Sequence, residues 1–398
     1  MDYDTGLKIA LGWNRRNMEL IGVWPEPTRT DERLPNSKVL FSMSLIVLFG
    51  ILPENANLYF VSGNFDLVME NLTMANLPSA NAMIKFIYAW YYKESLKPVI
   101  KCFYDDWYRV KTEEEKALML KMAKPAKFIS VWCSMLGLMM LVAYHILRIY
   151  TISRTDRASV SRDRLIIYPA YFPFDIRPTW RLLTVNFAQL MAGYSATLAY
   201  TTVDTFIAML IMHICGQFAV LKKKLLRLMD NDIQSESNEF QKELALIINK
   251  HEQLNGLAAK IEECFSMLLL IQLLFCTIEI CLQGFILLSV ILQNENGIFH
   301  FQMVHFIIFI SFVLVHIYLY CYIGEMLLVQ NREFSDCAYE SKWYNVSPPE
   351  AKCLLLIMKR SFRPLYLTAG KFSTFSMEMF SSILKTAMGY LSVLLTVT

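Results

Sequence analysis

Polar side chains at helical spacing run along the last hydrophobic stretch of the chain, residues 371–398. Positions three, four, seven and eight apart share one face of a helix, and here that face is small and polar while the opposite face is apolar. Such a helix could line a water-filled pore, although buried membrane helices also place small and polar residues at their contacts. The polar face comprises Glu378, Ser381, Ser382, Lys385, Gly389, Ser392, Val393 and Thr396.

No pattern typical of a catalytic or metal site accompanies this stripe. The sequence contains no phosphate-binding glycine loop, no His-Glu-x-x-His and no nucleophile elbow. Its nine cysteines show no metal-type pairing, since Cys276 and Cys281 lie five apart inside an apolar run. We therefore expect no enzyme activity, no catalytic residues, no metal, no cofactor and no nucleic-acid partner, and we expect the cysteines to be reduced and buried.

The composition places the stripe in a membrane protein. The chain has 398 residues, of which 55% are hydrophobic and 18% charged, and its mean hydropathy is +0.36. This is too apolar for a soluble protein and too charged for a chain that lies wholly in lipid. The first 37 residues show no signal peptide. We expect an all-α, multi-pass protein of the plasma membrane with sizeable polar loops.

Seven apolar runs qualify as candidate transmembrane helices. The second is weak because it carries Asn76, Asn81 and Lys85, and the fourth is too long for a bilayer and should project beyond it. Asp204 within the fourth run is expected to make a structural hydrogen bond. The runs are 38–61, 75–92, 126–147, 183–220, 265–292, 301–324 and 375–397.

The basic residues indicate the orientation of these helices. Of the 38 Lys and Arg, 29 fall in the N-terminal segment and in the loops on its side of the membrane. The exception is the loop between the third and fourth runs, which lies on the other side and carries seven Lys and Arg residues. The positive-inside rule then predicts a cytoplasmic N-terminus and an extracellular C-terminus. This is the inverse of a G-protein-coupled receptor.

The segments on the basic side are predicted to form a packed helical domain. Apolar residues recur at helical spacing from Glu239 without a break into the fifth run, and Pro348-Pro349-Glu350 opens a further amphipathic helix. Gly370 is expected to hinge into the last helix. The resulting plan is a cytoplasmic N-terminal segment, a bundle of four membrane helices, a cytoplasmic helical extension, helices five and six, an anchor segment and the polar-striped last helix, at 1–37, 38–220, 221–264, 265–324, 325–370 and 371–398. The resemblance described next implies that the four-helix bundle binds the ligand and that the last helix lines the pore.

Short motifs in the second half resemble those of the insect odorant receptor family. They are Asp204-Thr205-Phe206, His251-Glu252-Gln253-Leu254, Tyr322-Ile323-Gly324-Glu325, Lys342-Trp343-Tyr344 and the closing Tyr390-Leu391-Ser392-Val393-Leu394. The resemblance covers essentially the whole chain and is specific in its C-terminal third. Ile21-Gly22-Val23-Trp24-Pro25 is similar to ant, bee and wasp members.

The resemblance implies a ligand-gated, non-selective cation channel in the dendrite of an olfactory sensory neuron. An odour-tuned subunit of this kind assembles with the family's co-receptor as a tetramer around one pore lined by the last helix. Carried over through the Tyr-x-x-Val-Leu match, Val393 is the gate, with Tyr390 below it and Thr396 one turn above. Ser392 and Gly389 complete the lining, and Lys385 lies deeper, where the conduit is wide. Permeating cations would cross here.

The resemblance also implies a small volatile ligand bound in the outer half of the membrane bundle, between the second, third, fourth and sixth runs. His145 and His305 could donate hydrogen bonds to a ligand or bind a neighbouring helix. The sequon at Asn71 falls in the predicted first outer loop and tests the topology. The expected ligand contacts are Met83, Ile87, Tyr144, Leu147, Met191, Tyr194, Ser195, Phe306 and Phe309.

Two other functions remain open at this stage. The first is an inverted seven-span chemoreceptor, of the gustatory type or signalling through a soluble effector docked on the inner helical domain. The second is a transporter, which would show inverted repeats and broken helices in two matching halves. Seven spans with one polar final helix do not divide in that way.

Overall fold

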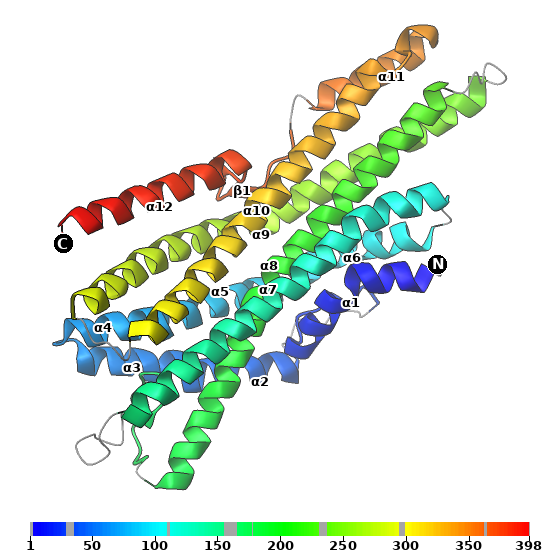
Figure 1. Cartoon of the computed structure of the whole chain (residues 1–398). Coiled ribbons are helices and arrows are strands. Elements are labelled where there is room, and N and C mark those ends of the chain that lie inside the picture. Colours follow the sequence, from blue (N-terminus) through cyan, green and yellow to red (C-terminus); the bar gives the residue numbers. More distant parts are fainter. Residues whose placement is uncertain are drawn as a thin grey trace.

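The computed structural model describes residues 3–28, 36–109, 112–154, 165–176, 178–230, 237–293, 299–361 and 364–397. Within them the chain is almost entirely helical, and the helices run along one long axis with the two termini at opposite ends of the molecule (Figure 1). The end that holds the N-terminus and α11 is called the anchor end below. The all-α prediction is confirmed apart from one two-stranded hairpin.

The first half of the chain supplies short helices that pack beside the long ones. Asn36 caps the first of the membrane helices by accepting a hydrogen bond from the backbone N–H of Val39. Two π-helical segments interrupt this half. The elements are α1 (Tyr3–Ile21), α2 (Ser37–Ile46), η1 (Val47–Ile51), α3 (Leu52–Val61), α4 (Phe65–Asn71), η2 (Leu72–Asn76), α5 (Leu77–Tyr91) and α6 (Lys93–Tyr108).

Four helices of 42 to 57 residues form the body of the molecule. A 52-residue helix such as α8 is about 78 Å long, far more than a bilayer core of about 30 Å. The fourth run is therefore longer than a bilayer core, as predicted, and its projection beyond the membrane stays a prediction. These helices are α7 (Glu113–Arg154), α8 (Thr179–Asp230), α9 (Ser237–Gln293) and α10 (Phe299–Glu340).

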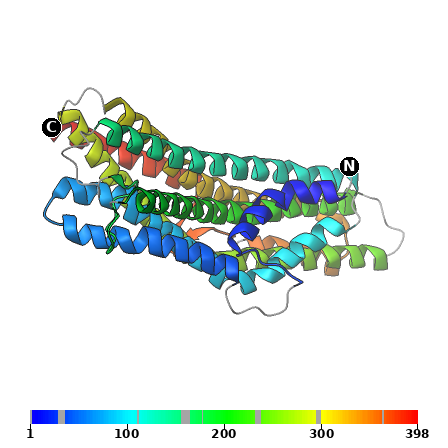
Figure 2. The same cartoon turned by 90° about the horizontal axis from the view of Figure 1, so that it is seen from below.

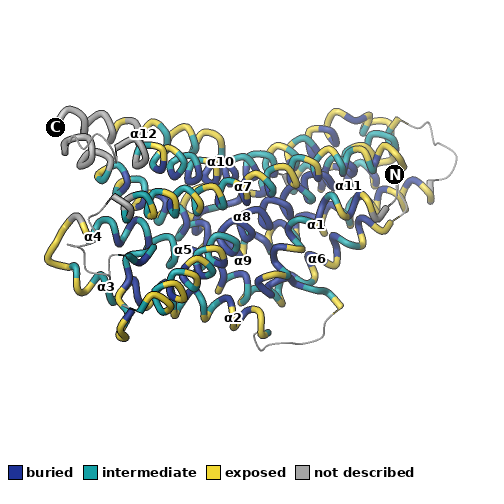
Figure 3. Tube along the Cα trace, turned by 60° about the horizontal axis from the view of Figure 1, so that its bottom comes forward, coloured by how far each residue is buried: buried dark blue, intermediate teal, exposed yellow. Residues whose placement is uncertain are grey.

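Helix α8 is the central element. It packs against α1, α2, α5, α7, α9 and α10, and it runs through the interior of the bundle (Figures 2 and 3). Its residues from Ala199 to Phe218 are buried almost without interruption, because neighbours surround that half on every side. A helix that is hydrophobic all round is expected to be buried in this way.

Five helical runs in the described part of the chain are long and apolar enough to cross a membrane. They lie at Ser37–Val61, Glu113–Tyr150, Thr179–Asp230, Glu239–Ile286 and Met303–Glu340, and correspond to the first, third, fourth, fifth and sixth predicted spans. The second predicted span is α5, whose 15 residues include the buried Lys85. The seventh is α12 (Met377–Val397). Among the described residues, five of the seven predicted spans are therefore long and apolar enough to cross a membrane.

The anchor end is a packed helical layer, as the periodicity predicted. Helix α9 runs unbroken from Ser237 to Gln293, and α11 (Pro348–Ser361) begins at the predicted proline pair and packs against α10. The basic run after the middle of α8 pairs with the acidic start of α7, including Arg227 with Glu114 and Lys224 with Glu115.

A hairpin connects this layer to the last helix. Strands β1 (Thr368–Ala369) and β2 (Ser373–Thr374) pair antiparallel across a turn in which Gly370 and Lys371 have positive φ. The Gly370 N–H donates to the carbonyl of Ser266 at 2.8 Å, and a Cβ at Gly370 would meet Leu270 Cδ2 at 2.6 Å. The predicted hinge is therefore a turn held against α9.

Candidate functional site

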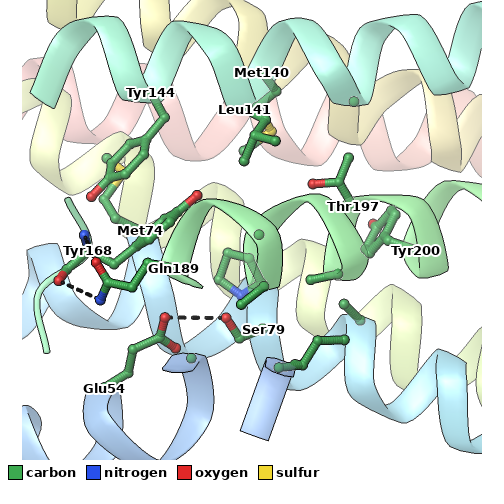
Figure 4. Close-up of a pocket in the computed structure, with 18 of the residues that line it drawn as sticks. Glu54, Met74, Ser79, Met140, Leu141, Tyr144, Tyr168, Gln189, Thr197 and Tyr200 are labelled. Atoms are coloured by element: carbon green, nitrogen blue, oxygen red, sulfur yellow. Dashed lines mark hydrogen bonds between the residues drawn. The ribbon is translucent and has the colours of Figure 1, made fainter. Parts of the chain in front are cut away.

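A cavity of about 100 Å³ lies in the half of the bundle away from the anchor end. Most of its lining is apolar or aromatic, and a smaller set of polar groups faces the same space (Figure 4). Ligand sites in proteins have this character. The lining residues are Ile46, Phe49, Gly50, Glu54, Thr73, Met74, Pro78, Ser79, Ala82, Gly137, Met140, Leu141, Tyr144, Tyr168, Gln189, Ala192, Gly193, Ala196, Thr197, Tyr200, Glu279, His305, Phe309 and Phe312.

Both π-helical segments of the first half contribute to this wall. Phe49 and Gly50 belong to η1, and Thr73 and Met74 belong to η2. The two segments pack against each other. A π-helical turn inserts one residue and breaks the regular hydrogen-bond ladder, so it is rare and is frequently found at functional sites. The local backbone therefore marks the same place as the cavity.

The segment before α8 closes one side of the cavity. Gln189 holds the backbone of Tyr168 at both ends, because its Oε1 accepts from the Tyr168 N–H at 3.2 Å and its Nε2 donates to the Tyr168 carbonyl at 3.4 Å. The Tyr144 hydroxyl donates to the carbonyl of Ile167 at 3.1 Å. The rings of Tyr144 and Tyr168 stack with centroids 4.9 Å apart. This aromatic wall is therefore fixed in place.

Two buried polar groups on the wall keep an unpartnered atom. Glu54 is 2% exposed; its Oε1 accepts from the Ser79 hydroxyl at 3.5 Å, but its Oε2 has no hydrogen-bond partner. The Nε2 of His305 is likewise buried without a partner. Because an unsatisfied buried polar atom costs free energy, such atoms beside a cavity point to a ligand.

Two of the nine predicted ligand contacts line the cavity, namely Tyr144 and Phe309. The structure places the other seven outside the lining. Ile87 and Tyr194 are 43% and 38% exposed and face outward, whereas Ser195 and Met83 are buried in helix contacts. Met191, Leu147 and Phe306 are half-buried. Their roles as ligand contacts remain predictions.

On α8 the predicted and the observed lining residues differ in the face of the helix on which they lie. On α8 the lining residues include Ala192, Gly193 and Ala196, next to the predicted Met191, Tyr194 and Ser195. Sequence reasoning favoured large aromatic and sulfur-containing side chains, but small residues create the space. It also missed Glu54 and Tyr168, although Glu54 follows Pro53 in an apolar run, where a carboxyl is a signal of function.

A buried charge cluster lies beside the cavity. Lys85 Nζ is 2.7 Å from Asp204 Oδ2, and His316 Nε2 is 3.6 Å from the same oxygen, with all three side chains fully buried. The Lys85 ammonium also lies 3.2 Å from the ring centroid of Tyr200, which lines the cavity. The expected structural role of Asp204 is thus an ion pair that joins α5, α8 and α10.

A second charge cluster lies at the anchor end. Asp106 of α6 meets Lys250 at 2.5 Å and His213 at 3.2 Å, and the His213 ring stacks on Phe103. Burial alone would raise the pKa of Asp106, but its hydrogen bonds and charge interactions with His213 and Lys250 outweigh burial and lower it to about 2. Asp106 therefore fastens α6 to α8 and α9 as a carboxylate.

Helix α12 turns its polar stripe away from the rest of the chain. Met379, Phe380 and Ile383 pack against the core, whereas the polar residues on the other face are exposed, namely Glu378, Ser381, Ser382, Lys385 and Gly389. The predicted two-faced character is confirmed for these residues. The side chains of Tyr390, Ser392, Val393 and Thr396 lie outside the described set.

Three further expectations are revised. Asn71 is 0% exposed as the last residue of α4, which continues directly into η2, and the Thr73 hydroxyl donates to the carbonyl of Met69 at 2.8 Å, so the folded sequon is closed to a glycan. The nine cysteines are all free, as expected, but Cys281 is exposed and Cys353 is half-buried. The His145 ring bonds the carbonyl of Leu141 on its own helix rather than facing the cavity.

Comparison with known proteins places the chain in a family. Residues 64–388 match the family model described as "7tm Odorant receptor". The chain is 24% identical to Odorant receptor 13a of Drosophila melanogaster, covering 96% of this chain and 94% of the relative, and 22% identical to Odorant receptor 94a of the same fly over similar shares.

Solved structures agree in fold. The insect olfactory receptor OR5 from Machilis hrabei superposes with a TM-score of 0.82 over 100% of both chains at 14% identity, and the same receptor in complex with eugenol with a TM-score of 0.81 at 15% identity. The hymenopteran origin remains a prediction. The match over most of the chain shows that it belongs to the insect odorant receptor family of membrane proteins, whose members are ligand-gated channel receptors and not enzymes.

Proposed function

We propose that this chain is the odour-tuned subunit of a ligand-gated, non-selective cation channel and that the cavity beside Tyr144 binds a small volatile molecule. The observation that carries the proposal is the cavity itself, which lies among long or interrupted helices and is walled mainly by apolar groups. Its volume of about 100 Å³ is of the same order as the roughly 150 Å³ apolar cavity that admits benzene.

The long helices couple this cavity to the rest of the protein. Helix α8 lines it with Gln189 and Tyr200 and then continues into the anchor end, and α10 lines it with Phe309 and continues to α12 through direct packing. We propose that an odorant binds the open arrangement better than the closed one and so shifts the population towards the open state.

In this proposal α12 lines a central pore shared by a tetramer that includes the family's co-receptor. Support comes from the exposed stripe of Ser381, Ser382 and Lys385, which one subunit leaves uncovered. The N-terminus is cytoplasmic and the C-terminus extracellular, which puts the ligand cavity in the outer half of the membrane and the anchor end inside the cell. Val393 forms the gate, where an apolar ring excludes water.

Whole-cell current tests the proposal. The full chain is expressed in a non-insect cell line with and without an insect co-receptor, with G-protein signalling blocked, and exposed to single volatile compounds. A rapid cation current that requires both subunits is the expected result. A response that the block abolishes would replace the channel with an effector-coupled receptor.

The gate has its own matched pair of variants. Val393→Thr keeps the side-chain volume but adds a hydroxyl, so it should wet the constriction and raise the basal current. By helical spacing, Leu391 lies on the opposite, apolar face, and Leu391→Val should leave the basal current close to that of the wild type. An unchanged basal current in Val393→Thr channels that reach the surface would exclude Val393 as the gate.

A further inference from the structure

Glu54 gives the cavity a chemical preference. It lies two residues into α3, directly after the π-helical segment η1, and its carboxyl group points towards Ser79 across the cavity (Figure 4). The residue is 2% exposed, and its Oε2 has no hydrogen-bond partner. A buried carboxyl group without a full set of partners is costly, and this cost is removed if a bound molecule supplies the missing bond.

No lysine or arginine of the described residues lines the cavity, and the ring Nε2 of His305, which does line it, has no hydrogen-bond partner, so Glu54 makes no bond to a basic group there. Two basic side chains of the same bundle are engaged elsewhere. Lys85 pairs with Asp204 at 2.7 Å, and Arg148 pairs with Glu70 at 3.3 Å and donates to the carbonyl of Ile166. The bond that Glu54 lacks must therefore come from outside the chain.

Three hydrogen-bond donors on the same wall are already used within the protein. The Tyr144 hydroxyl donates to the Ile167 carbonyl, the Gln189 amide to the Tyr168 carbonyl and the Thr73 hydroxyl to the Met69 carbonyl. An ionised carboxyl group only accepts hydrogen bonds, and a protonated one keeps an acceptor oxygen beside its O–H donor. In either state Glu54 can accept a hydrogen bond from a ligand.

We infer that the cavity selects volatile molecules of about one-ring size whose polar end donates a hydrogen bond, a hydroxyl or a protonated amine, and that Glu54 receives this donor. The inference rests on the proposed odorant site and adds the ligand class. The apolar body of such a molecule lies against Leu141, Phe309 and Phe312, and the aromatic wall of Tyr144 and Tyr168 lies beside it.

The test compares four compounds that share one skeleton: 2-phenylethanol, its methyl ether, 2-phenylethylamine and ethylbenzene. The ether keeps the oxygen and loses only the donor. For the wild-type chain with co-receptor, the half-maximal concentration for the alcohol or the amine should be about 10- to 100-fold lower than for the ether. Equal potency of the alcohol, the amine and the ether would overturn the inference.

Variants assign the preference to Glu54. Glu54→Met removes the acceptor and should bring the donor-to-ether ratio to within about threefold, whereas Glu54→Gln keeps a neutral acceptor and should weaken the amine more than the alcohol. Glu263→Gln removes an exposed carboxylate outside the lining and should keep the wild-type ratio. A ratio that survives both Glu54 variants would overturn the inference.

A second readout separates this inference from the channel proposal. The thermal midpoint of the purified full chain is measured with each compound, so binding is followed without current. A rise with the alcohol or amine that exceeds the ether and requires Glu54 supports the inference even if no current flows. Currents evoked only by the ether or ethylbenzene would support the channel proposal and overturn the proposed ligand class. The absence of any shift or current with all four compounds would also overturn the proposed ligand class.

Discussion

The two halves of α8 differ in how they are packed. From Ala199 to Phe218 the helix is buried almost continuously, with Asp204 paired inside it, whereas from Thr179 to Leu198 it exposes Trp180 and Leu183 and leaves the cavity on its inner side. One continuous helix therefore joins a tightly packed region to a region with free volume. The stability of the protein should depend on the packed half, Ala199 to Phe218, and its ligand response on the half beside the cavity, Thr179 to Leu198.

The largest expected effect is in the packed half. Asp204→Leu leaves the Lys85 ammonium buried without its partner, and removing one member of a buried pair costs about 3–5 kcal/mol. The thermal midpoint of purified protein and the amount at the cell surface should both fall steeply. The control is the double variant Lys85→Met with Asp204→Leu, which removes both charges. A double variant no more stable than the single one would show that the ion pair is not the cause.

The second effect concerns Asp106 at the anchor end. Its pKa of about 2 is below the ordinary 3.8, so the ionised carboxylate stabilises the folded state above about pH 4, by about 2 kcal/mol, and this contribution is lost as the pH falls from 4 to 2. Asp106→Asn should therefore be less stable than wild type at pH 7, and the gap should close towards pH 2. Thermal unfolding across this pH range measures it.

The neighbouring Asp105 is exposed and offers a matched control. Asp105→Asn should have the thermal stability of the wild type at every pH, because it leaves the bonds of Asp106 to His213 and Lys250 intact. The groups that face Asp106 are His213, Lys250 and the Cys102 thiol, whose pKa burial raises to about 11. A gap between wild type and Asp106→Asn that does not change with pH would contradict the assignment.

Sequence reasoning succeeded where a regular pattern carried the information. Unbroken periodicity from Glu239 gave the long α9, and the proline pair gave the start of α11. It failed where three-dimensional packing decides, because the cavity depends on absent side chains at Gly137 and Gly193, on the single methyl group of Ala196 and on the phase of α8. Lys85 weakened a predicted span, and its partner Asp204 lies 119 positions away, so no local pattern could join them.

The third effect lies in the cavity half. A Cβ at Gly193 would be 3.0 Å from the Tyr168 hydroxyl and 3.2 Å from Leu141 Cδ1, and Gln189 restrains Tyr168 from moving away. Gly193→Ala should therefore fill part of the cavity and weaken the odour response by about 10-fold, as one added methyl group costs about 1–3 kcal/mol in a packed site. Concentration–response curves of the co-receptor-dependent current measure this loss.

A glycine in open space provides the comparison. A Cβ at Gly256 meets nothing within 4 Å, so Gly256→Ala should leave the odour response unchanged and stabilise α9 by about 0.5–1 kcal/mol. If both alanine variants weakened the response equally, the loss would reflect helix stiffening and not lost cavity volume.

The smallest expected effect separates the sequence-based site from the structural one. Tyr194 was predicted to contact ligand, yet it is 38% exposed on the outer face of α8, whereas Tyr144 is 7% exposed and lines the cavity. Tyr194→Ala should change the half-maximal odorant concentration by less than about twofold, because surface substitutions away from special features have small effects. Tyr144→Ala should raise it by at least about 10-fold, since it removes the ring that stacks on Tyr168. If Tyr194→Ala proved the more damaging of the two, the ligand would bind on the outer face of α8, and the cavity would be a feature of packing alone.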